Sequence, residues 1–142
     1  SQTGYALDDL YKELNRMSSK STTVFLDACF SGVNRNNEML LANARPVFLE
    51  VDNSFTDRVN VFSAAGGKQI ASSWPEKKHG LFSYFLMKGM RGDADINNDR
   101  KLTYGELGKY LEENVSSTAG LLDREQTPSL SSQNENNIFI AY

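Results

Sequence analysis

The sequence predicts a single α/β domain over residues 1–142, because helical and strand-like segments alternate along it. An amphipathic helical pattern over 7–17 leads directly into a short β-branched and aromatic run that starts at Thr22. A second such run, 59–65, is followed by two apolar helical segments. The predicted elements in order are a helix at 7–17, strands that start at 22, 46 and 59, helices at 80–90 and 104–115, and a terminal strand at 138–142.

The helices and loops follow from side-chain spacing and from residues that end regular structure. Gly92 is positioned to close the second helix, and the Asn-rich segment 32–44 has the composition of a surface loop. The strand around Phe25 is apolar on both faces, so we expect it inside a sheet with a neighbour on each side. The inward-facing helix residues are Leu7, Leu10, Tyr11, Leu14 and Met17, then Leu81, Phe82, Phe85, Leu86 and Met90, then Leu107, Tyr110 and Leu111.

Composition narrows the class of function. The net charge of -3, without a basic stripe, argues against nucleic acid as a partner. No apolar run approaches the roughly 20 residues that span a bilayer, so no membrane partner is expected. A single cysteine cannot form an internal disulfide, which leaves localisation open and slightly favours the cytoplasm.

That cysteine, Cys29, ends the strand that starts at Thr22. Open α/β folds place their chemistry at the carboxyl edge of the sheet, where this sulfur would lie. Asp27 lies two residues earlier, so alternation along the strand puts its side chain on the same face as Cys29. The alternative is that Cys29 is a small buried hydrophobic residue, as many free cysteines are.

Three segments of the chain resemble caspase-like cysteine peptidases, the clan of caspases and metacaspases. The motif Asp-Ala-Cys-Phe-Ser-Gly at 27–32 is similar to their nucleophile motif, and 59–65 to the next core strand. The segments 72–74 and 79–86 are similar to the groove strand and the helix after it. The resemblance covers nearly the whole chain. It implies a three-layer sandwich with a mostly parallel central sheet, of which this chain is the C-terminal portion.

The resemblance implies a cysteine endopeptidase with Cys29 as nucleophile, acting on a peptide or protein substrate. The family's catalytic histidine follows an earlier strand in a Gly-His-Gly turn that this chain lacks. We therefore expect an N-terminal segment of the same domain to supply it, with maturation by self-cleavage. The chain's single histidine, His79, begins the helix after the groove strand, where the family's catalytic histidine does not sit.

Three further residues are expected to bind the substrate. A carboxylate beside the thiol would raise the thiol's pKa, so Asp27 is better suited to binding a cationic substrate side chain. In the metacaspase branch an aspartate at this position does so, which implies cleavage after Arg or Lys. Pro75 follows Trp74 where caspases carry an arginine for aspartate substrates. Ser73 and Trp74 would form the groove that holds the substrate as an added strand. The alternatives are a strand-end cap for Asp27 and core packing for Trp74.

A second motif, at 95–106, has the ligand spacing of an EF-hand calcium loop. Arg100 stands where the pattern has glycine, which could cost on the order of 1 kcal/mol. The alternative is that Thr103 and Glu106 form a capping box for the following helix and need no metal. A calcium ion here would be structural or activating. The expected ligands are Asp95, Asn97, Asp99, the carbonyl of Lys101, and Glu106.

Two other functional classes stay open. A non-catalytic module with the same fold could bind calcium or act as a scaffold, and the presence or absence of an upstream histidine turn would distinguish it from the enzyme. A flavodoxin-like binding domain is disfavoured, because no phosphate-binding Gly-rich loop follows the first strand.

Overall fold

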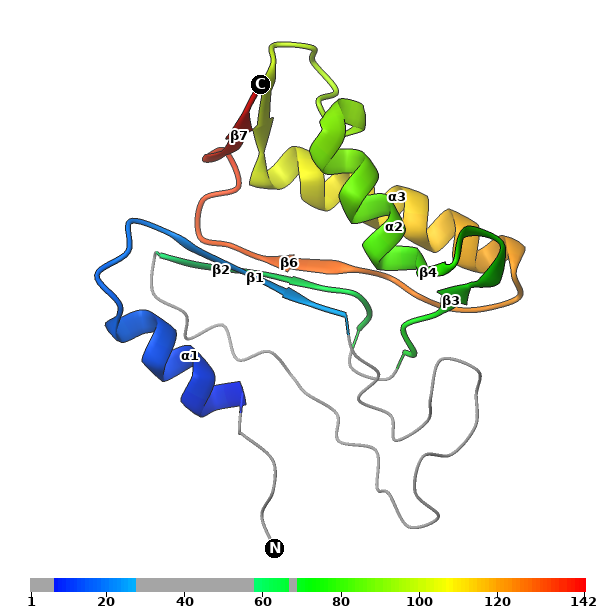
Figure 1. The fold of residues 1–142 in the computed structure, drawn as a ribbon, viewed down its shortest axis with the longest axis horizontal. Coiled ribbons are helices and arrows are strands. Elements are labelled where there is room, and N and C mark those ends of the chain that lie inside the picture. Colours follow the sequence, from blue (N-terminus) through cyan, green and yellow to red (C-terminus); the bar gives the residue numbers. More distant parts are fainter. Residues whose placement is uncertain (1–6, 28–57, 67–68) are drawn as a thin grey trace, which may run out of the picture.

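The computed structural model describes residues 7–27, 58–66 and 69–142. It shows an α/β fold in which helices cover both faces of a small mixed sheet (Figure 1). One helix lies on one face and two lie on the other. The helices are α1 (Leu7–Arg16), α2 (Leu81–Lys88) and α3 (Tyr104–Leu121).

The main sheet has the strand order β1 (Thr22–Leu26), β2 (Val59–Ser63), β6 (Ser129–Ser131). β1 and β2 are parallel, whereas β6 is antiparallel to β2. Every residue of β2 is buried and every residue of β1 is half-buried. The expectation of a neighbour on each side of Phe25 is therefore met on one side only among the described strands, and β2 is their interior strand.

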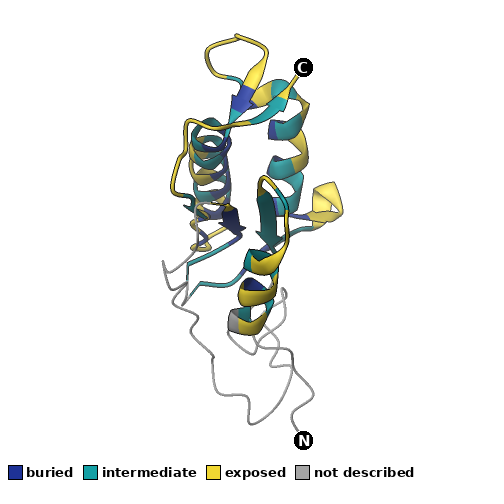
Figure 2. Cartoon of the chain, turned by 90° about the vertical axis from the view of Figure 1, so that its left-hand side faces the viewer, coloured by how far each residue is buried: buried dark blue, intermediate teal, exposed yellow. Residues whose placement is uncertain are grey.

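Side-chain alternation divides the core between the two faces of the sheet. Val59 and Val61 pack with Tyr11 of α1 on one face. Phe62, the residue after Val61, points to the other face and joins the larger cluster under α2 and α3. Burial is concentrated where the helices meet the sheet, and the outer surfaces of the helices are exposed (Figure 2).

A short hairpin leads from the sheet into α2. Its strands are β3 (Ser73–Trp74) and β4 (His79–Gly80), joined by a 3₁₀ turn (Pro75–Lys77). Lys78 closes the turn at a φ of 55°, a left-handed backbone conformation that is uncommon for residues other than Asn and Gly. β3 covers Ser73 and Trp74, and the role of this strand as a substrate groove stays a prediction.

The predicted starts of α2 and α3 are confirmed to within one residue, but both helices end at other residues than predicted. α2 runs into a wide π-type turn (Gly89–Asp93), which Gly92 closes at a φ of 117° as expected of a helix-ending glycine. α3 is longer than the predicted 104–115, because Ala119 lies one turn after Val115 and continues the buried stripe.

A second, two-stranded sheet joins the calcium-like loop to the end of the chain. It pairs β5 (Lys101–Thr103) with β7 (Ile138–Ala141) in antiparallel orientation. The terminal strand was predicted from its apolar run. Its pairing with β5 was not, because register is set by tertiary contacts.

Strand β6 was not predicted at all. Its three residues, Ser-Leu-Ser, hold a single apolar side chain, and only the pairing with β2 makes the segment a strand. The predicted loop at 32–44 and the predicted strand that starts at Pro46 lie outside the described residues.

Candidate active site at the carboxyl edge of the sheet

β1 and β2 are parallel, so their carboxyl ends meet at one edge of the sheet. The two ends are joined by a hydrogen bond of 2.8 Å from the Ala64 N–H to the Leu26 carbonyl. Asp27 follows directly after Leu26 at this edge. Cys29, the expected nucleophile, lies outside the described residues, so the site is built here from Asp27 and the groups around it.

Asp27 is half-buried and faces α2. Its carboxylate accepts a hydrogen bond from the Ser83 hydroxyl, which lies in the first turn of α2. Alternation from Phe25, whose ring packs on the α2 and α3 side, places Asp27 on that same side. Ser83 was missed by sequence reasoning, since one serine in an apolar helix gives no signal of its partner.

Gln126 is a second residue that sequence reasoning missed. Its side chain is buried, with 2% of its surface exposed, and it links two segments. Its Oε1 accepts from the Ser72 N–H at 2.6 Å, and its Nε2 donates to the Ala64 carbonyl at 2.8 Å. Gln126 therefore fixes the β3–β4 hairpin to the carboxyl end of β2. Nothing in the polar segment around it marked this glutamine before the structure was known.

Ser73 presents its backbone to the outer edge of the hairpin. The Leu81 N–H donates to the Ser72 carbonyl at 2.9 Å, so Ser72 and Leu81 form a hydrogen-bonded pair across the two strands. Backbone groups alternate in direction along a strand, so the N–H and C=O of Ser73 point away from β4. The Ser73 carbonyl accepts a 3.2 Å hydrogen bond from Nη1 of Arg124.

Trp74 lies beside this edge and packs on α2. Its ring is edge-to-face with Tyr84 at a centroid distance of 5.2 Å and lies 5.8 Å from Phe85. The ammonium of Lys77 lies 5.6 Å from the Trp74 ring centroid, a cation–π distance. Trp74 is half-buried, so one side contributes to the core and the other is accessible. His79, exposed on β4, is the cross-strand neighbour of Trp74.

The predicted calcium loop lies between α2 and α3, at the other end of these helices from the hairpin (Figure 1). Its acidic and amide side chains turn toward the loop backbone. The Asp95 carboxylate accepts from the Arg100 N–H at 2.9 Å, and Asn97 Oδ1 accepts from the Asp99 N–H at 2.8 Å. Asp99 Oδ1 in turn accepts from the Lys101 N–H at 2.9 Å. Each of these three side chains therefore caps a backbone N–H of its own loop.

Two residues of the loop depart from a calcium site. Arg100 adopts a φ of 65°, the left-handed conformation for which the pattern reserves glycine. Glu106 Oε2 accepts from both the N–H and the hydroxyl of Thr103, at 3.0 and 2.8 Å, and Thr103 caps α3 in return. Thr103 and Glu106 therefore form the capping box of α3. The part of the chain that the structure describes holds no cluster of three His, Cys, Asp or Glu side chains placed to bind a metal.

The last residue of the chain closes this loop. The Tyr142 N–H donates to the Arg100 carbonyl at 2.9 Å, and its hydroxyl donates to the Met90 carbonyl at 3.1 Å. The pKa of Tyr142 is raised, first by burial and then by the negative charges of Asp95 and Glu106. The pKa of the Tyr142 hydroxyl therefore depends on the negative charge of the loop.

Comparison with known proteins adds no relative: no family model and no curated protein matches the sequence. Among the described residues, no helix has the length and apolar character needed to cross a membrane. The functional argument therefore depends on the residues and geometry above.

Proposed function

We propose that this chain is the nucleophile-bearing part of a caspase-like cysteine endopeptidase that cleaves peptides after Arg or Lys. The observation that carries the proposal is the placement of Asp27. It follows the last residue of a parallel strand at the sheet's carboxyl edge, and it is held by Ser83 at the start of α2. Cys29 lies two residues further along the chain from Asp27. The helix, sheet and helix layers are the architecture that a caspase-like sandwich requires.

The reaction needs groups beyond this chain. Cys29 attacks the substrate carbonyl as a thiolate, so a base must remove its proton and later protonate the departing amine. We assign that base to a histidine in an N-terminal segment of the same domain. Water then hydrolyses the thioester and regenerates the thiol. The Cys29 backbone N–H supplies one donor to the oxyanion.

Substrate positioning depends on the hairpin. An extended peptide would pair with the outward N–H and C=O of Ser73, while the ring of Trp74 forms one wall. Arg124 holds the Ser73 carbonyl in this structure, so it must release that carbonyl when the peptide pairs there. Asp27 then binds the basic side chain before the scissile bond.

Two matched variants test the role of Asp27 in the full-length protein. Asp27→Asn removes the charge but keeps an oxygen that can accept from Ser83, whereas Ser83→Ala keeps the charge and removes the donor. We expect Asp27→Asn to lower kcat/KM for fluorogenic Arg and Lys peptides by about thirty-fold or more, because a buried charge pair loses one partner. Ser83→Ala should retain most turnover. Equal losses in the two variants would reduce Asp27 to a structural anchor.

The same assays decide the wider proposal. Cys29→Ala should abolish turnover and also stop self-cleavage, as measured by intact mass of the full-length protein. A preference for peptides ending in Asp would overturn the assignment of Asp27. A full-length protein that folds, binds calcium and cleaves none of these peptides would support the scaffold alternative.

We also propose that the 95–106 loop binds Ca²⁺ as a structural or activating ion. The side chains of Asp95, Asn97 and Asp99 and the carbonyl of Lys101 would hold it, since hard cations prefer such oxygen ligands. What supports this is the left-handed backbone at Arg100, which a simple capping box does not require. Glu106 would contribute its second oxygen or exchange Thr103 for the metal.

Tyr142 offers a direct readout of calcium binding. A bound cation offsets the charges of Asp95 and Glu106 that raise the pKa of Tyr142, so Ca²⁺ should lower that pKa. The shift is measured by ultraviolet titration as the difference from Tyr142→Phe. Arg100→Gly should raise the free energy of unfolding by about 1 kcal/mol, because the loop already holds Arg100 at a φ of 65° and glycine relieves that strain. A gain in Ca²⁺ affinity that Arg100→Gly shares with Arg100→Ala would come from removing the positive charge. An unchanged Tyr142 titration at saturating Ca²⁺ would reject the site.

A further inference from the structure

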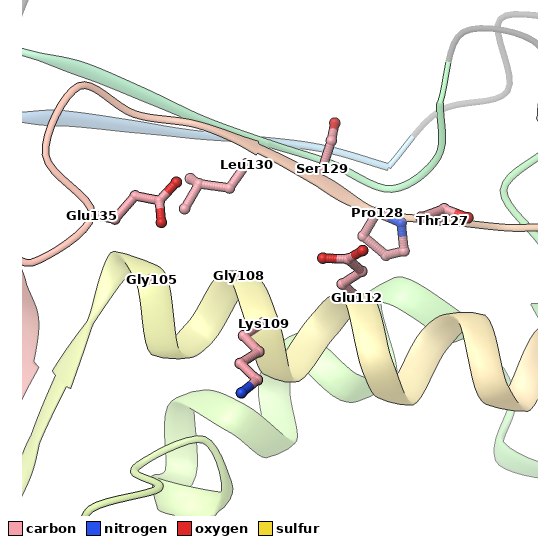
Figure 3. Close-up of a pocket in the computed structure, with 9 residues that line it drawn as sticks. All are labelled: Gly105, Gly108, Lys109, Glu112, Thr127, Pro128, Ser129, Leu130 and Glu135. Carbon is pink, nitrogen blue, oxygen red and sulfur yellow. The ribbon is translucent and has the colours of Figure 1, made fainter.

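A groove lies between α3 and the segment 127–135, and its end at Thr127 adjoins Gln126 of the candidate active site (Figure 3). Its volume is about 440 Å³. Two glycines of α3 let the helix approach this segment closely, because a Cβ at Gly108 would lie 3.0 Å from Leu130 and one at Gly105 would lie 3.2 Å from Glu135. The groove is lined by Gly105, Gly108, Lys109, Glu112, Thr127, Pro128, Ser129, Leu130 and Glu135.

The charge of this groove is negative. Glu112 and Glu135 both extend into the space between α3 and β6, whereas the ammonium of Lys109 points away from it (Figure 3). Lys109 is also 3.9 Å from the Glu113 carboxylate, which lies outside the groove lining. Within the described parts of the chain, neither Glu112 nor Glu135 has an ion-pair or hydrogen-bond partner for its carboxylate. The groove therefore offers two unneutralised carboxylates to a cation.

The backbone beside the groove also has no strand partner among the described residues. Two hydrogen bonds, from the Thr22 N–H to the Arg58 carbonyl and from the Ala64 N–H to the Leu26 carbonyl, show that the even-numbered residues of β2 face β1. Val61 and Ser63 therefore bond to β6, opposite Ser131 and Ser129. Between these two serines, Leu130 directs its N–H and C=O away from β2. Among the strands that the structure describes, β6 is therefore an edge strand, and this edge forms one wall of the groove.

We propose that this groove is a docking site for an extended, basic peptide segment. The segment pairs with the Leu130 backbone and places two Lys or Arg side chains on Glu112 and Glu135. Glu135 lies over Gly105, seven residues before Glu112, so the two carboxylates are separated by roughly 10 Å along the helix. On an extended chain, side chains on one face that are two and four residues apart are separated by about 7 and about 13 Å. This binding requires neither Cys29 nor Asp27.

The test uses the full chain with Cys29→Ala, so that no probe is cleaved. The probe is a fluorescein-labelled peptide with two arginines two residues apart among threonines and alanines, and its control carries citrulline in place of both. We expect Glu112→Gln/Glu135→Gln to weaken binding of the arginine peptide by about five-fold, as two exposed ion pairs contribute. Raising the salt concentration should weaken binding of the arginine peptide by a similar factor.

Three comparisons make the outcome decisive. Glu13→Gln/Asp123→Asn removes the same charge at two other exposed sites and should leave the affinity unchanged, as should Asp27→Asn. The Leu130 N–H should become protected from hydrogen exchange at saturating peptide. Equal affinity for the citrulline peptide, an unprotected Leu130 N–H, or a loss that appears with Asp27→Asn instead would overturn the proposal. So would self-association that only the Glu112→Gln/Glu135→Gln variant abolishes, since the occupant would then be a second copy.

Discussion

The two faces of the sheet differ in what they bury. On the α1 side the buried cluster holds Tyr11, Val59 and Val61, and the remaining apolar contacts are half-buried. On the α2 and α3 side the cluster is larger and is continued by an aromatic chain from Phe25 through Phe62 to Tyr104. The groups of the candidate active site, Asp27 with Ser83 and Gln126 with Ser72, lie on this second side.

The larger buried cluster and the contacts that position the candidate site therefore lie in the same half of the molecule. The hairpin that carries Ser73 and Trp74 is held both by packing on α2 and by the buried Gln126 bridge. The α1 helix covers the opposite face of the sheet, where it packs on Val59 and Val61. A change on the α2 and α3 side should therefore alter stability and site together, while a change on the α1 side should alter stability alone.

The largest contrast should come from the same substitution on the two faces. Leu111 on α3 is fully buried, and Leu14 on α1 is half-buried. Leu111→Ala should lower the free energy of unfolding by about 3–4 kcal/mol through lost burial and a new cavity, and Leu14→Ala by about 1 kcal/mol. Urea denaturation measures both. Equal losses would show that the α1 face carries as much of the core as the other.

A smaller difference in unfolding free energy is expected between substitutions of two glutamines that each link distant segments, Gln126 and Gln69. Gln126→Leu leaves the Ser72 N–H and the Ala64 carbonyl buried without partners, which should cost about 1–3 kcal/mol. Gln69, a partly exposed bridge, accepts from the Thr127 N–H at 2.7 Å, and water can replace it there. Gln69→Leu should therefore cost under about 1 kcal/mol. If Gln126→Leu also leaves peptide turnover unchanged, the hairpin does not depend on this bridge.

The smallest effect concerns pH. Tyr110 is a residue of α3, and its ring faces Phe85 of α2 at a centroid distance of 6.4 Å. Burial raises its pKa, and the opposing positive charge of Lys88 is the smaller influence. Because the folded-state pKa is the higher one, its contribution to stability is complete below about pH 10 and is lost as the pH rises further. Tyr110→Phe should flatten the fall in unfolding free energy above that pH, as followed by denaturant titrations. An identical fall in both proteins would contradict this.

The candidate site residues were singled out by two kinds of signal. The end of an apolar run indicates Asp27, whereas Ser73 and Trp74 come from the family resemblance. The partners of these residues could not be predicted. Ser83 lies 56 positions from Asp27, and Gln126 lies 54 from Ser72, so each contact depends on how distant segments pack. The Arg124 contact with Ser73 is of the same kind.

By itself, the sequence determined the helices, the strands that start at Thr22 and Val59, and the loop spacing of 95–106, because periodicity and turn chemistry act over a few neighbouring residues. Tertiary structure decided which strand is interior, that Ser129–Ser131 is a strand, and that the end of the chain pairs with β5. These features depend on backbone hydrogen bonds between segments far apart in sequence. Their free energy is realised only when the core brings those segments together.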